Sequence, residues 1–585
     1  MNVLGLLLVV GILGNGWLVN AFRADLLLAT QIVHQEKKFS EAAVVTNSEI
    51  CTNIGLFFYY YSEILSEEGS AADAAIGALL CEGVTNPQSM GVGGGFLLTF
   101  YNGATKNVEV LNARESAPKA ASKDMFGGPA SGDGDIGTGA LSVAVPGELM
   151  GYWALHQRYG KMSWYDIFKP TIDLCEHGVT VTHYTARMIG HLRDEILASA
   201  TIKDLMTNPQ TGDLYKEGDL MLRPALAETL EMVAKHGPSV LYHGNLTEDF
   251  IYDIRDNGGI ITVEDMKHYS ASWLTPVSGV IGDFKVFSAP SPGSGRLLLT
   301  ILEVMSKKLS CKDDLFWHRL VECWKFAFGL RSSMTGPCIG DKATNDSKQH
   351  DGAVVRDIIK KMKDCSIYPS PKDYFEHGKP AAPDHGTSHL AVLAPNGDAV
   401  SVTSTINLSF GSMFASESTG IILNNEMIDF SIPHHYDFKS SKGDGNLIAP
   451  NRQPMSSMLP TIVLDKNRDL RLVIGSSGGF KIITSTSAVI LQHLFMGVGL
   501  EEAVHNRRLH HQLRPMLVEY EEGFHDEVLH SLMSKGHKLQ QLDAASKPNT
   551  SSSMSMHSGV NAIAVVSGEI HAVADSRRTG VADGY

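Results

Sequence analysis

Two apolar runs separated by a four-residue polar turn constrain the fold of this chain more than any other feature. Residues 387–394 and 399–406 contain no Asp, Glu, Lys or Arg, and Pro395-Asn396-Gly397-Asp398 lies between them. An Asn-Gly pair flanked by apolar runs is a strong local signal for a β-hairpin. We therefore expect two mostly buried antiparallel strands, with Thr387 at the start of the first facing Thr405 at the end of the second.

The pair Gly386-Thr387 at the start of this hairpin suggests a specific chemistry. A threonine hydroxyl is a weak nucleophile unless a base lies beside it, and few bases are near in the sequence. Cleavage of the Gly386–Thr387 bond would free an α-amino group, with an ordinary pKa of about 7.7–8.0, that can take the hydroxyl proton. The alternative is that Gly-Thr only opens a strand, and the pair taken alone favours that alternative.

Composition indicates a globular protein and argues against a nucleic-acid-binding one. The chain has 585 residues, of which 43% are hydrophobic and 19% charged, as is typical of a large globular protein with a full core. Its net charge of −15 argues against nucleic acid as a partner, because a phosphate-binding surface needs an excess of basic residues.

The amino-terminal segment, residues 1–22, is apolar but short for a bilayer span, which needs ~20 apolar residues. Val19-Asn20-Ala21 resembles a small-residue cleavage site, so a removed signal peptide and an uncleaved membrane anchor both stay open. Either one places the rest of the chain outside the cell, secreted or anchored to the plasma membrane. Glycosylation sequons at Asn245, Asn345 and Asn549 fit that location.

The cysteines and histidines predict no metal site. Seven cysteines show no CxxC pair and no histidine at zinc spacing. His505, His510 and His511 lie among arginines, without an i, i+4 pair on a helix. We expect no metal and no cofactor. All seven cysteines precede Thr387, so disulfides would not join two pieces cut at that residue.

The glycine-rich run Ser89–Gly95 superficially resembles a dinucleotide-binding loop. That fingerprint follows a strand and opens a helix. Here the order is reversed, because the small-residue helix predicted over 71–81 precedes the run and a strand over 96–100 follows it. We therefore do not expect nucleotide binding. Residues from about 140 to 375 read as a mainly helical scaffold, with a single strand over 280–289.

Several charged residues are candidates for substrate recognition. Arg114 follows a predicted strand and could hold a carboxylate in a bidentate fashion, although a surface ion pair is the favoured alternative for the residue alone. Glu426 and Asp429 follow two asparagines and could bind an ammonium group, or could cap a turn. Ser456 and Ser457 lie between hydrophobic residues, where their hydroxyls could satisfy a buried turn.

A strand over 470–474, a glycine-rich turn and a helix over 481–495 form an anion-binding pattern near the carboxyl end. The turn and the helix start present backbone N–H groups and positive partial charge. No lysine-threonine pair follows, which argues against a phosphate cradle. The N–H groups of Gly478 and Gly479 can instead form an oxyanion hole for acyl transfer, typically worth ~3 kcal/mol per donor.

Taken together, these motifs closely resemble the γ-glutamyltransferase (γ-glutamyl transpeptidase) family from about Glu49 to Tyr585. The resemblance is carried by 81–95, Asn112 to Pro118, Asp384-His385-Gly386-Thr387-Ser388-His389, Ser404 to Ser412, Asn424 to Phe430, Pro454 to Thr461 and Gly475 to Gly479. It implies an α+β fold, the four-layer αββα sandwich of N-terminal nucleophile hydrolases. It also implies a precursor that cuts itself into a large subunit, 23–386, and a small subunit, 387–585, which form a heterodimer.

The resemblance assigns a role to each candidate residue. Thr387 attacks the γ-glutamyl carbonyl with its own amine as base, Thr405 hydrogen-bonds the nucleophile, and Gly478 and Gly479 hold the oxyanion. The substrate's α-carboxylate and α-ammonium groups bind to separate sets: Arg114, Ser456 and Ser457 for the carboxylate, and Asn407, Glu426 and Asp429 for the ammonium. Cys51 and Cys81 correspond to the family's paired cysteines, although an insertion around 56–63 lengthens the segment between them.

The resemblance further implies glutathione and its S-conjugates as donors, and water, amino acids or dipeptides as acceptors. Phe480 and Ser409 depart from the family pattern and leave donor and acceptor preference open. Two alternatives remain: a related acylase for another acyl group, such as a cephalosporin side chain, and an inactive or unprocessed homologue that binds γ-glutamyl compounds.

Overall fold

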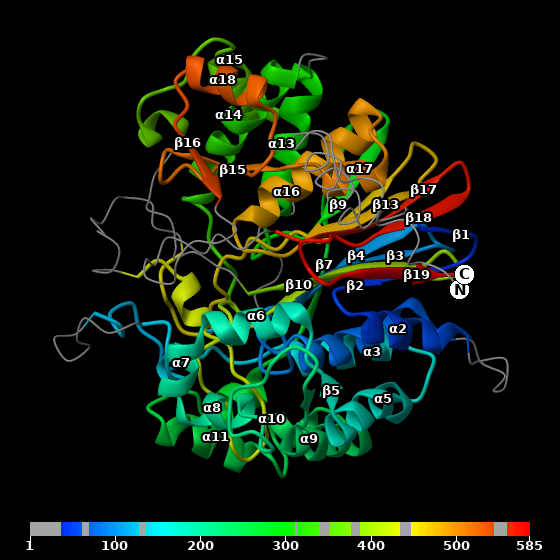
Figure 1. The fold of residues 1–585 in the computed structure, drawn as a ribbon, viewed down its shortest axis with the longest axis vertical. Coiled ribbons are helices and arrows are strands. Elements are labelled where there is room, and N and C mark those ends of the chain that lie inside the picture. Colours follow the sequence, from blue (N-terminus) through cyan, green and yellow to red (C-terminus); the bar gives the residue numbers. More distant parts are fainter. Residues whose placement is uncertain are drawn as a thin grey trace, which may run out of the picture. The chain divides into compact units, whose positions relative to one another are not determined.

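Two seven-stranded antiparallel sheets form the centre of the fold in this computed structural model (Figure 1). The structure describes residues 37–60, 69–127, 136–309, 313–339, 352–375, 386–432, 446–542 and 558–585. In order across the sheet, sheet A contains β1 (Lys37–Phe39), β18 (Glu569–Val573), β17 (Val560–Val566), β13 (Leu470–Ser476), β12 (Thr461–Leu464), β9 (Phe284–Ser288) and β8 (Val277–Ile281). Sheet B contains β19 (Val581–Gly584), β2 (Ala43–Thr46), β10 (Ser388–Leu393), β11 (Ala399–Thr405), β3 (Gly95–Asn102), β4 (Asn107–Ala113) and β7 (Ser272–Leu274).

The predicted hairpin is confirmed and lies in the middle of sheet B. Strands β10 and β11 pair antiparallel from Ser388 opposite Ser404 to Leu393 opposite Ala399. Gly397 in the connecting turn has a φ of 82°, the left-handed conformation that an Asn-Gly turn requires. Thr387 therefore immediately precedes β10 at the level where β11 ends.

The two faces of sheet B have different partners. Along β10, Ala391 and Leu393 pack in one apolar cluster with Val473 of sheet A. Leu390 and Val392 point the other way, into the cluster that contains helix α3. Because side chains alternate along a strand, odd-numbered residues of β10 face sheet A and even-numbered residues face the helices.

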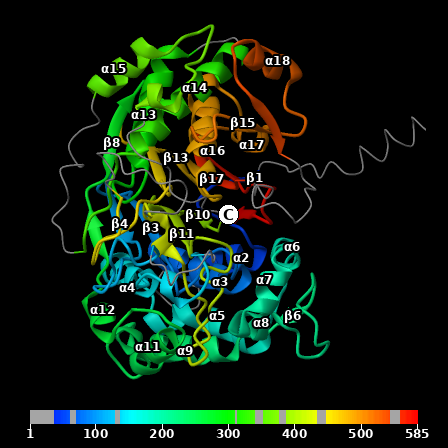
Figure 2. The same cartoon turned by 90° about the vertical axis from the view of Figure 1, so that its left-hand side faces the viewer.

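Helices cover the outer face of each sheet, on opposite sides of the strands (Figures 1 and 2). On the sheet B side are α2 (Glu49–Tyr60), α3 (Ala71–Thr85), α4 (Glu148–Tyr159), α5 (Trp164–His177), α6 (His183–His191), α7 (Arg193–Ala198), α8 (Ala200–Met206), α9 (Pro224–His236), α10 (Ser239–Tyr242), α11 (Thr247–Asp256) and α12 (Val263–His268). On the sheet A side are α13 (Gly295–Lys308), α14 (Asp313–Arg331), α15 (Gly352–Lys361), α16 (Lys481–Ile490) with its π-helical extension η6 (Leu491–Phe495), α17 (Leu500–His505) and α18 (Asp526–Ser534).

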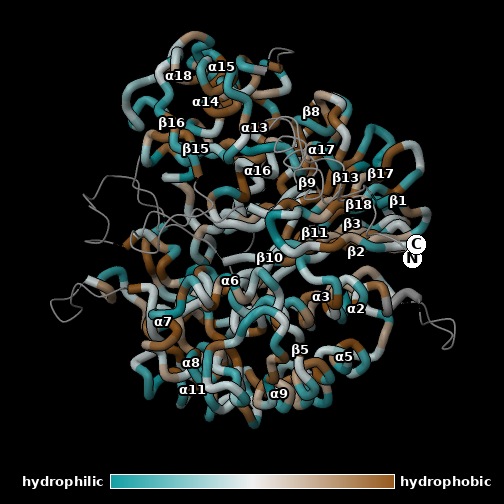
Figure 3. The backbone as a smooth tube through the Cα atoms, viewed as in Figure 1, coloured by the Kyte–Doolittle hydropathy of each residue, from teal (hydrophilic) through white to brown (hydrophobic). Residues whose placement is uncertain are grey.

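The remaining elements are short: η2 (Ala140–Ser142), η4 (Pro371–Tyr374), η5 (Glu426–Asp429), a sheet of β14 (Leu509–His510), β15 (Val518–Glu521) and β16 (Leu539–Leu542), and a pair of β5 (Val179–Thr180) and β6 (Leu220–Met221). Apolar segments run through the strands and through helices on both sides of them (Figure 3). Helix, sheet, sheet and helix follow one another, which confirms the predicted four-layer αββα sandwich.

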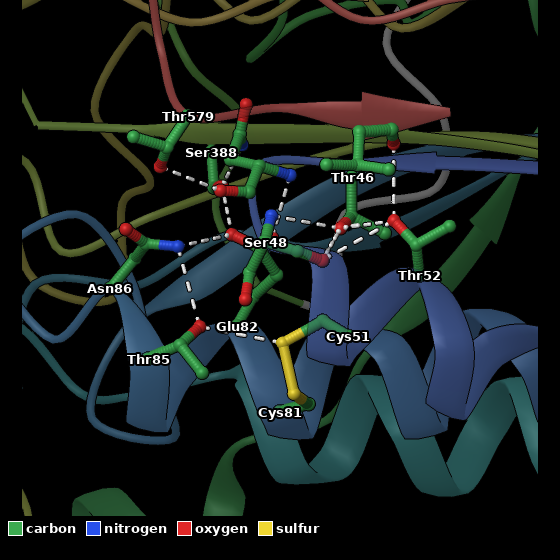
Figure 4. The surroundings of a disulfide bond; sticks show 12 residues. Thr46, Ser48, Cys51, Thr52, Cys81, Glu82, Thr85, Asn86, Ser388 and Thr579 are labelled. Atoms are coloured by element: carbon green, nitrogen blue, oxygen red, sulfur yellow. Dashed lines mark hydrogen bonds between the residues drawn. A yellow bond between two sulfur atoms is a disulfide. The ribbon is translucent and has the colours of Figure 1, made fainter. Parts of the chain in front are cut away.

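Helix α3 shows why a sequence of small residues suits the helix next to sheet B. It begins at a capping box, in which the Ser70 hydroxyl and the Asp73 carboxylate each bind the other's backbone N–H. Almost every residue of the helix is buried, because its alanines let α3 lie close to the sheet. Cys81 near its end forms a disulfide with Cys51 of α2, with Cα atoms 5.4 Å apart, as the resemblance implies (Figure 4).

The prediction of one strand over 280–289 was wrong. The segment contains the end of β8 and then β9, which form a hairpin with Ile281 opposite Phe284. Gly282, with a φ of 60°, lies in the turn between them. The apolar residues on either side of the Gly-Asp pair obscured this turn. The predicted helix over 481–495 is confirmed by α16 and η6.

Several sequence predictions fall outside the described residues, among them the amino-terminal segment 1–22 and the sequons at Asn345 and Asn549. Asn245 lies exposed in the turn before α11. In the described part of the chain, no helix is both long enough and apolar enough to cross a membrane.

Burial of His510 predicts sensitivity to acid. Its ring hydrogen-bonds the Thr484 hydroxyl at 2.8 Å and Gln512 Oε1 at 3.0 Å, and burial lowers its pKa to about 4. In the unfolded chain this histidine takes up a proton near pH 6.5, whereas in the folded protein it stays neutral. Stability is therefore lost as the pH falls from about 6.5 toward 4.

We expect the thermal midpoint to fall over this interval and His510→Gln to make the fall less steep. Scanning calorimetry across the pH series measures the effect. The matched control is His530→Gln, at an exposed position of α18, which should leave the slope unchanged. An unchanged slope for His510→Gln would contradict the prediction.

Candidate active site

Both threonine hydroxyls of the hairpin converge on one carbonyl group. The Thr405 hydroxyl donates to the carbonyl oxygen of Gly386 at 2.7 Å, and the Thr387 hydroxyl donates to the same oxygen. The two hydroxyl oxygens lie 3.4 Å apart. The Gly386 N–H in turn donates to the carbonyl oxygen of Asn407 at 2.6 Å. The intact Gly386–Thr387 bond, where the cut was predicted, is thus held beside both hydroxyls.

The run of glycines at 93–95 allows other backbones to approach β3 closely. A Cβ at Gly94 would overlap the carbonyl oxygen of Thr405, and one at Gly93 would overlap that of Ile422. The run follows α3 and enters β3, which confirms the predicted order of elements. These glycines make room for the segments around Thr405 and Ile422.

Asn407 adopts a left-handed conformation, with a φ of 72°, just beyond β11. Its Nδ2 donates to the carbonyl oxygen of Asn425 at 3.1 Å. Its Oδ1 is buried and accepts no hydrogen bond from the residues that the structure describes. An unsatisfied buried acceptor is unfavourable, so a ligand that donates to it would be favoured.

The glycine turn after β13 lies on the same side of sheet B as Thr387. His389 of β10 packs on Gly475 so closely that a Cβ there would overlap the imidazole ring. Gly478 and Gly479 follow, with φ values of 106° and 61°. Within the described ranges, neither of their N–H groups donates a hydrogen bond to a protein atom. Two donors that are unused within the described ranges therefore follow Gly475, the residue on which His389 packs.

Arg114 is buried among three carboxylates. Its guanidinium lies 2.6 Å from Asp429 Oδ2, 2.8 Å from Glu426 Oε1 and 3.3 Å from Glu115 Oε2. The alternative of a surface ion pair for Arg114 was wrong, because the residue is buried. Tyr269 and Gln453 cover the segment and hydrogen-bond the Arg114 carbonyl. Burial raises the pKa of Glu115 to about 7. The cluster combines one guanidinium with an excess of carboxyl groups.

The position of Arg114 in sheet B relates the charged cluster to Thr387. The start of β10, the end of β11, the start of β3 and the end of β4 lie at one end of the sheet. Strands β10 and β4 are separated by three strand spacings, a distance of roughly 14 Å at ~4.8 Å per spacing. An arginine side chain and a small amino acid together can cover that separation.

Ser456 and Ser457 lie in a segment that contacts Arg114 through the carbonyl oxygen of Pro454, 3.4 Å from Nε. The Ser456 hydroxyl accepts from the Met458 N–H at 3.2 Å, which is the turn role considered for it. The Ser457 hydroxyl is buried without a partner among the described residues. Glu426 and Asp429 lie on η5, and their carboxylates contact the Arg114 guanidinium.

Three buried glutamates near the site were not predicted. Glu115 joins the Arg114 cluster, Glu148 accepts from the Ser404 hydroxyl at 2.9 Å, and Glu82 accepts from the Ser388 hydroxyl at 2.8 Å. The signal available for Glu82 was a single carboxylate in an otherwise apolar stretch of helix. In the part of the chain that the structure describes, no group of three or more His, Cys, Asp or Glu is arranged to hold a metal.

Solved structures define the class of protein. Cephalosporin acylase from Bacillus halodurans matches 94% of this chain with 97% of its own, at a TM-score of 0.79 and 20% identity. γ-Glutamyltranspeptidase from Helicobacter pylori is 27% identical and covers 55% of this chain and 92% of its own, at a TM-score of 0.50. The fold is that of the N-terminal nucleophile hydrolases.

Sequence comparison defines the family within that class. The model of the gamma-glutamyltranspeptidase family matches residues 58–585. Scoloptoxin SSD14 of Scolopendra dehaani is 39% identical over 519 residues, 86% of this chain and 87% of that protein. Glutathione hydrolase 5 proenzyme of Homo sapiens is 34% identical over 578 residues, 94% of this chain and 93% of that protein. The chain belongs to the γ-glutamyltranspeptidase family.

The charged cluster predicts a large effect of removing its guanidinium. Arg114→Ala removes the guanidinium from three buried carboxyl groups, and breaking a buried pair in this way typically lowers the free energy of unfolding by about 3–5 kcal/mol. Urea unfolding measures the loss. The control is Lys307→Ala, which removes an exposed i, i+4 pair with Glu303 and should lower stability by only about 0.3–0.5 kcal/mol. Equal losses for the two variants would contradict the prediction.

Proposed function

We propose that this protein is a self-processing γ-glutamyltransferase and glutathione hydrolase that acts through a γ-glutamyl ester of Thr387. The observation that carries the proposal is the convergence of the Thr387 and Thr405 hydroxyls on the carbonyl of the intact Gly386–Thr387 bond. Membership of the family supports the same reaction.

Maturation begins at that bond. The Thr387 Oγ1 attacks the carbonyl carbon of Gly386, and the Thr405 hydroxyl stabilises the negative charge that develops on the carbonyl oxygen. As the C–O bond forms, the Gly386–Thr387 C–N bond breaks and the departing nitrogen takes a proton to become the free amine. Water then hydrolyses the ester. The products are a large subunit that ends at Gly386 and a small subunit of 199 residues, 387–585.

Turnover uses the groups that maturation exposes. The free Thr387 amine accepts the hydroxyl proton while Oγ1 attacks the γ-carbonyl of the donor, and the cysteinyl-glycine or other amine departs with a proton. The N–H groups of Gly478 and Gly479 stabilise the oxyanion, at ~3 kcal/mol per donor. Water or the amine of an amino acid or dipeptide then cleaves the γ-glutamyl ester and regenerates the hydroxyl.

Specificity for a γ-glutamyl group follows from the charged cluster. Its amino acid end carries a carboxylate, which suits Arg114, and an ammonium, which suits Glu426 and Asp429. The buried acceptor of Asn407 and the hydroxyl of Ser457, together with Ser456, supply further contacts. An acyl group without these charges would leave the cluster unmatched, which argues against the acylase alternative.

An extracellular site of action fits the remaining features. The buried Cys51–Cys81 disulfide is typical of proteins that fold in an oxidising compartment. Asn245 is exposed in a turn, as a glycosylated asparagine must be. We propose that residues 1–22 direct the chain into the secretory route, as a signal peptide or a membrane anchor.

The first test is Thr387→Ala. We expect this variant to remain a single chain and to release no γ-glutamyl-anilide product, because it lacks the hydroxyl for both steps. Denaturing mass spectrometry and amino-terminal sequencing of the wild type should show a small fragment that begins at Thr387. An uncut Thr387→Ala protein that is active, or an uncut wild type that is inactive, would overturn the mechanism.

Gly478→Ala should separate maturation from turnover. A Cβ at this position would meet Ser558 Cα at 2.9 Å, and the φ of 106° disfavours any residue except glycine. The loop must shift, and loss of one oxyanion donor typically lowers kcat about 100-fold or more. Self-cleavage uses Thr405 instead and should proceed normally. Time courses of fragment formation and anilide release, measured on one preparation, distinguish the two steps, and equal slowing of both would contradict these roles.

A further inference from the structure

The two central strands of sheet B carry a matched pair of serines next to the paired threonines. Ser388 and Ser404 lie opposite each other in register. Each hydroxyl donates to a buried glutamate, Ser388 to Glu82 of α3 at 2.8 Å and Ser404 to Glu148 of α4 at 2.9 Å. These contacts lie on the helix-facing side of the sheet, opposite the side that holds Thr387.

Glu82 is the centre of a group of polar side chains beside the Cys51–Cys81 disulfide (Figure 4). Its carboxylate accepts from the Ser388 hydroxyl, from the Asn47 N–H at 2.7 Å and from Asn86 Nδ2 at 3.1 Å. The Asn47 side chain also donates to the Ser388 hydroxyl. Ser388 is therefore held from two directions, by Glu82 and by Asn47.

A buried carboxyl group at this place is unfavourable for packing alone. Glu82 is 1% exposed in a helix whose preceding residues are mostly alanine and leucine. Removal of its charge from water raises its pKa, so the folded protein loses stability by keeping it ionised. An apolar residue would fill the same position without that loss. The contacts to Ser388 and Asn47 are what the carboxylate adds.

The Ser388 anchor matters because of where the nucleophile lies. Thr387 precedes the first paired residue of β10, and cleavage would leave it as a chain end with no residue before it. Adjacent side chains of a strand point to opposite faces, so holding the Ser388 side chain on the helix face fixes the direction of Thr387 on the other face. Without this anchor, the first residues of β10 can rotate or fray.

We propose that Glu82 is a positioning residue for the Thr387 nucleophile and acts through the Ser388 hydroxyl. The proposal rests on the proposed function, in which Thr387 is the nucleophile. Glu82 does not touch the reacting atoms. It aims the hydroxyl and the amine of Thr387 at the carbonyl to be attacked, both in self-cleavage and in turnover.

Ser388→Ala, Glu82→Gln and the double variant test this proposal. Each is assayed for the rate of self-cleavage and for kcat and KM with γ-glutamyl-anilide, with kcat expressed per Thr387 amino terminus counted by sequencing. Small misplacements of a nucleophile cost about 10- to 100-fold in rate, so we expect kcat to fall by that factor in Ser388→Ala while KM changes little. The double variant should lose no more than the worse single variant, because both changes break one contact.

Glu322→Gln is the matched control. Glu322 is an equally buried carboxylate on α14 that binds Lys325 at 2.7 Å and Tyr374 at 2.9 Å, on the sheet A side of the molecule. We expect it to lower the thermal midpoint and to leave kcat per amino terminus unchanged. A purely structural role for Glu82 predicts the same pattern for Glu82→Gln, and that result would overturn the proposal.

Two further outcomes are informative. If Glu82→Gln does not fold, Ser388→Ala carries the test, because it keeps the carboxylate with its donors from Asn47 and Asn86. Wild-type rates of self-cleavage and turnover in Ser388→Ala would then refute the positioning role. If the wild type itself neither cuts itself nor releases anilide, the proposed function fails and this proposal fails with it. That outcome differs from one in which the wild type and Ser388→Ala are both fully active, which would refute the positioning role alone.

Discussion

The register between β10 and β11 is the constraint on which the other features of the site depend. With Ser388 opposite Ser404, Thr387 and Thr405 meet on the face toward sheet A, and both serines reach the buried glutamates on the other face. A slip of one residue would exchange the two faces of the strand that moved. The hydroxyls would then point into the helices, and His389 would leave its place on Gly475. In β11, Val400 and Val402 pack in the helix-side cluster and alternate with Ser401 and Thr403, so a slip of that strand would bring hydroxyl groups into the apolar cluster.

The cluster around Arg114 is not the arrangement that would give the most stable core. One guanidinium and three carboxyl groups are removed from water, and such a group is often no more stable than apolar residues of the same volume. The zwitterionic end of the γ-glutamyl substrate proposed above suits such a cluster, because its ammonium can pair with the carboxylates and its carboxylate with the guanidinium. The Asn407 Oδ1 and the Ser457 hydroxyl, which have no hydrogen-bond partner among the described residues, lie in the segments that lead to this cluster. These groups suit the γ-glutamyl substrate proposed above.

Local sequence signals predicted the hairpin, helix α3, the strand after the glycine run and the strand–turn–helix at 470–495, since each depends on neighbouring residues. The resemblance to the family added the layers of the fold and the pairing of Cys51 with Cys81. Burial of Arg114 could not be predicted from the sequence, because it depends on Tyr269 and Gln453, which are distant in the sequence. The turn at Gly282 was missed for a local reason, since apolar residues flank it on both sides. Glu82 was overlooked although a carboxylate near the end of the otherwise uncharged run 74–85 of α3 is a visible anomaly.

Both central sheets interleave strands from the two sides of the Gly386–Thr387 bond. In sheet B, β19, β10 and β11 follow the bond and β2, β3, β4 and β7 precede it, with β2 between β19 and β10. In sheet A, β18, β17, β13 and β12 follow the bond and lie between β1 on one side and β9 and β8 on the other, all three of which precede it. Neither part can complete a sheet alone, and each would expose several unpaired strand edges that favour aggregation. While the chain is intact, the bond acts as a tether that keeps the two parts at a high effective concentration. The proposed scission must therefore follow folding, and two parts synthesised from separate messages would have to find each other without that help.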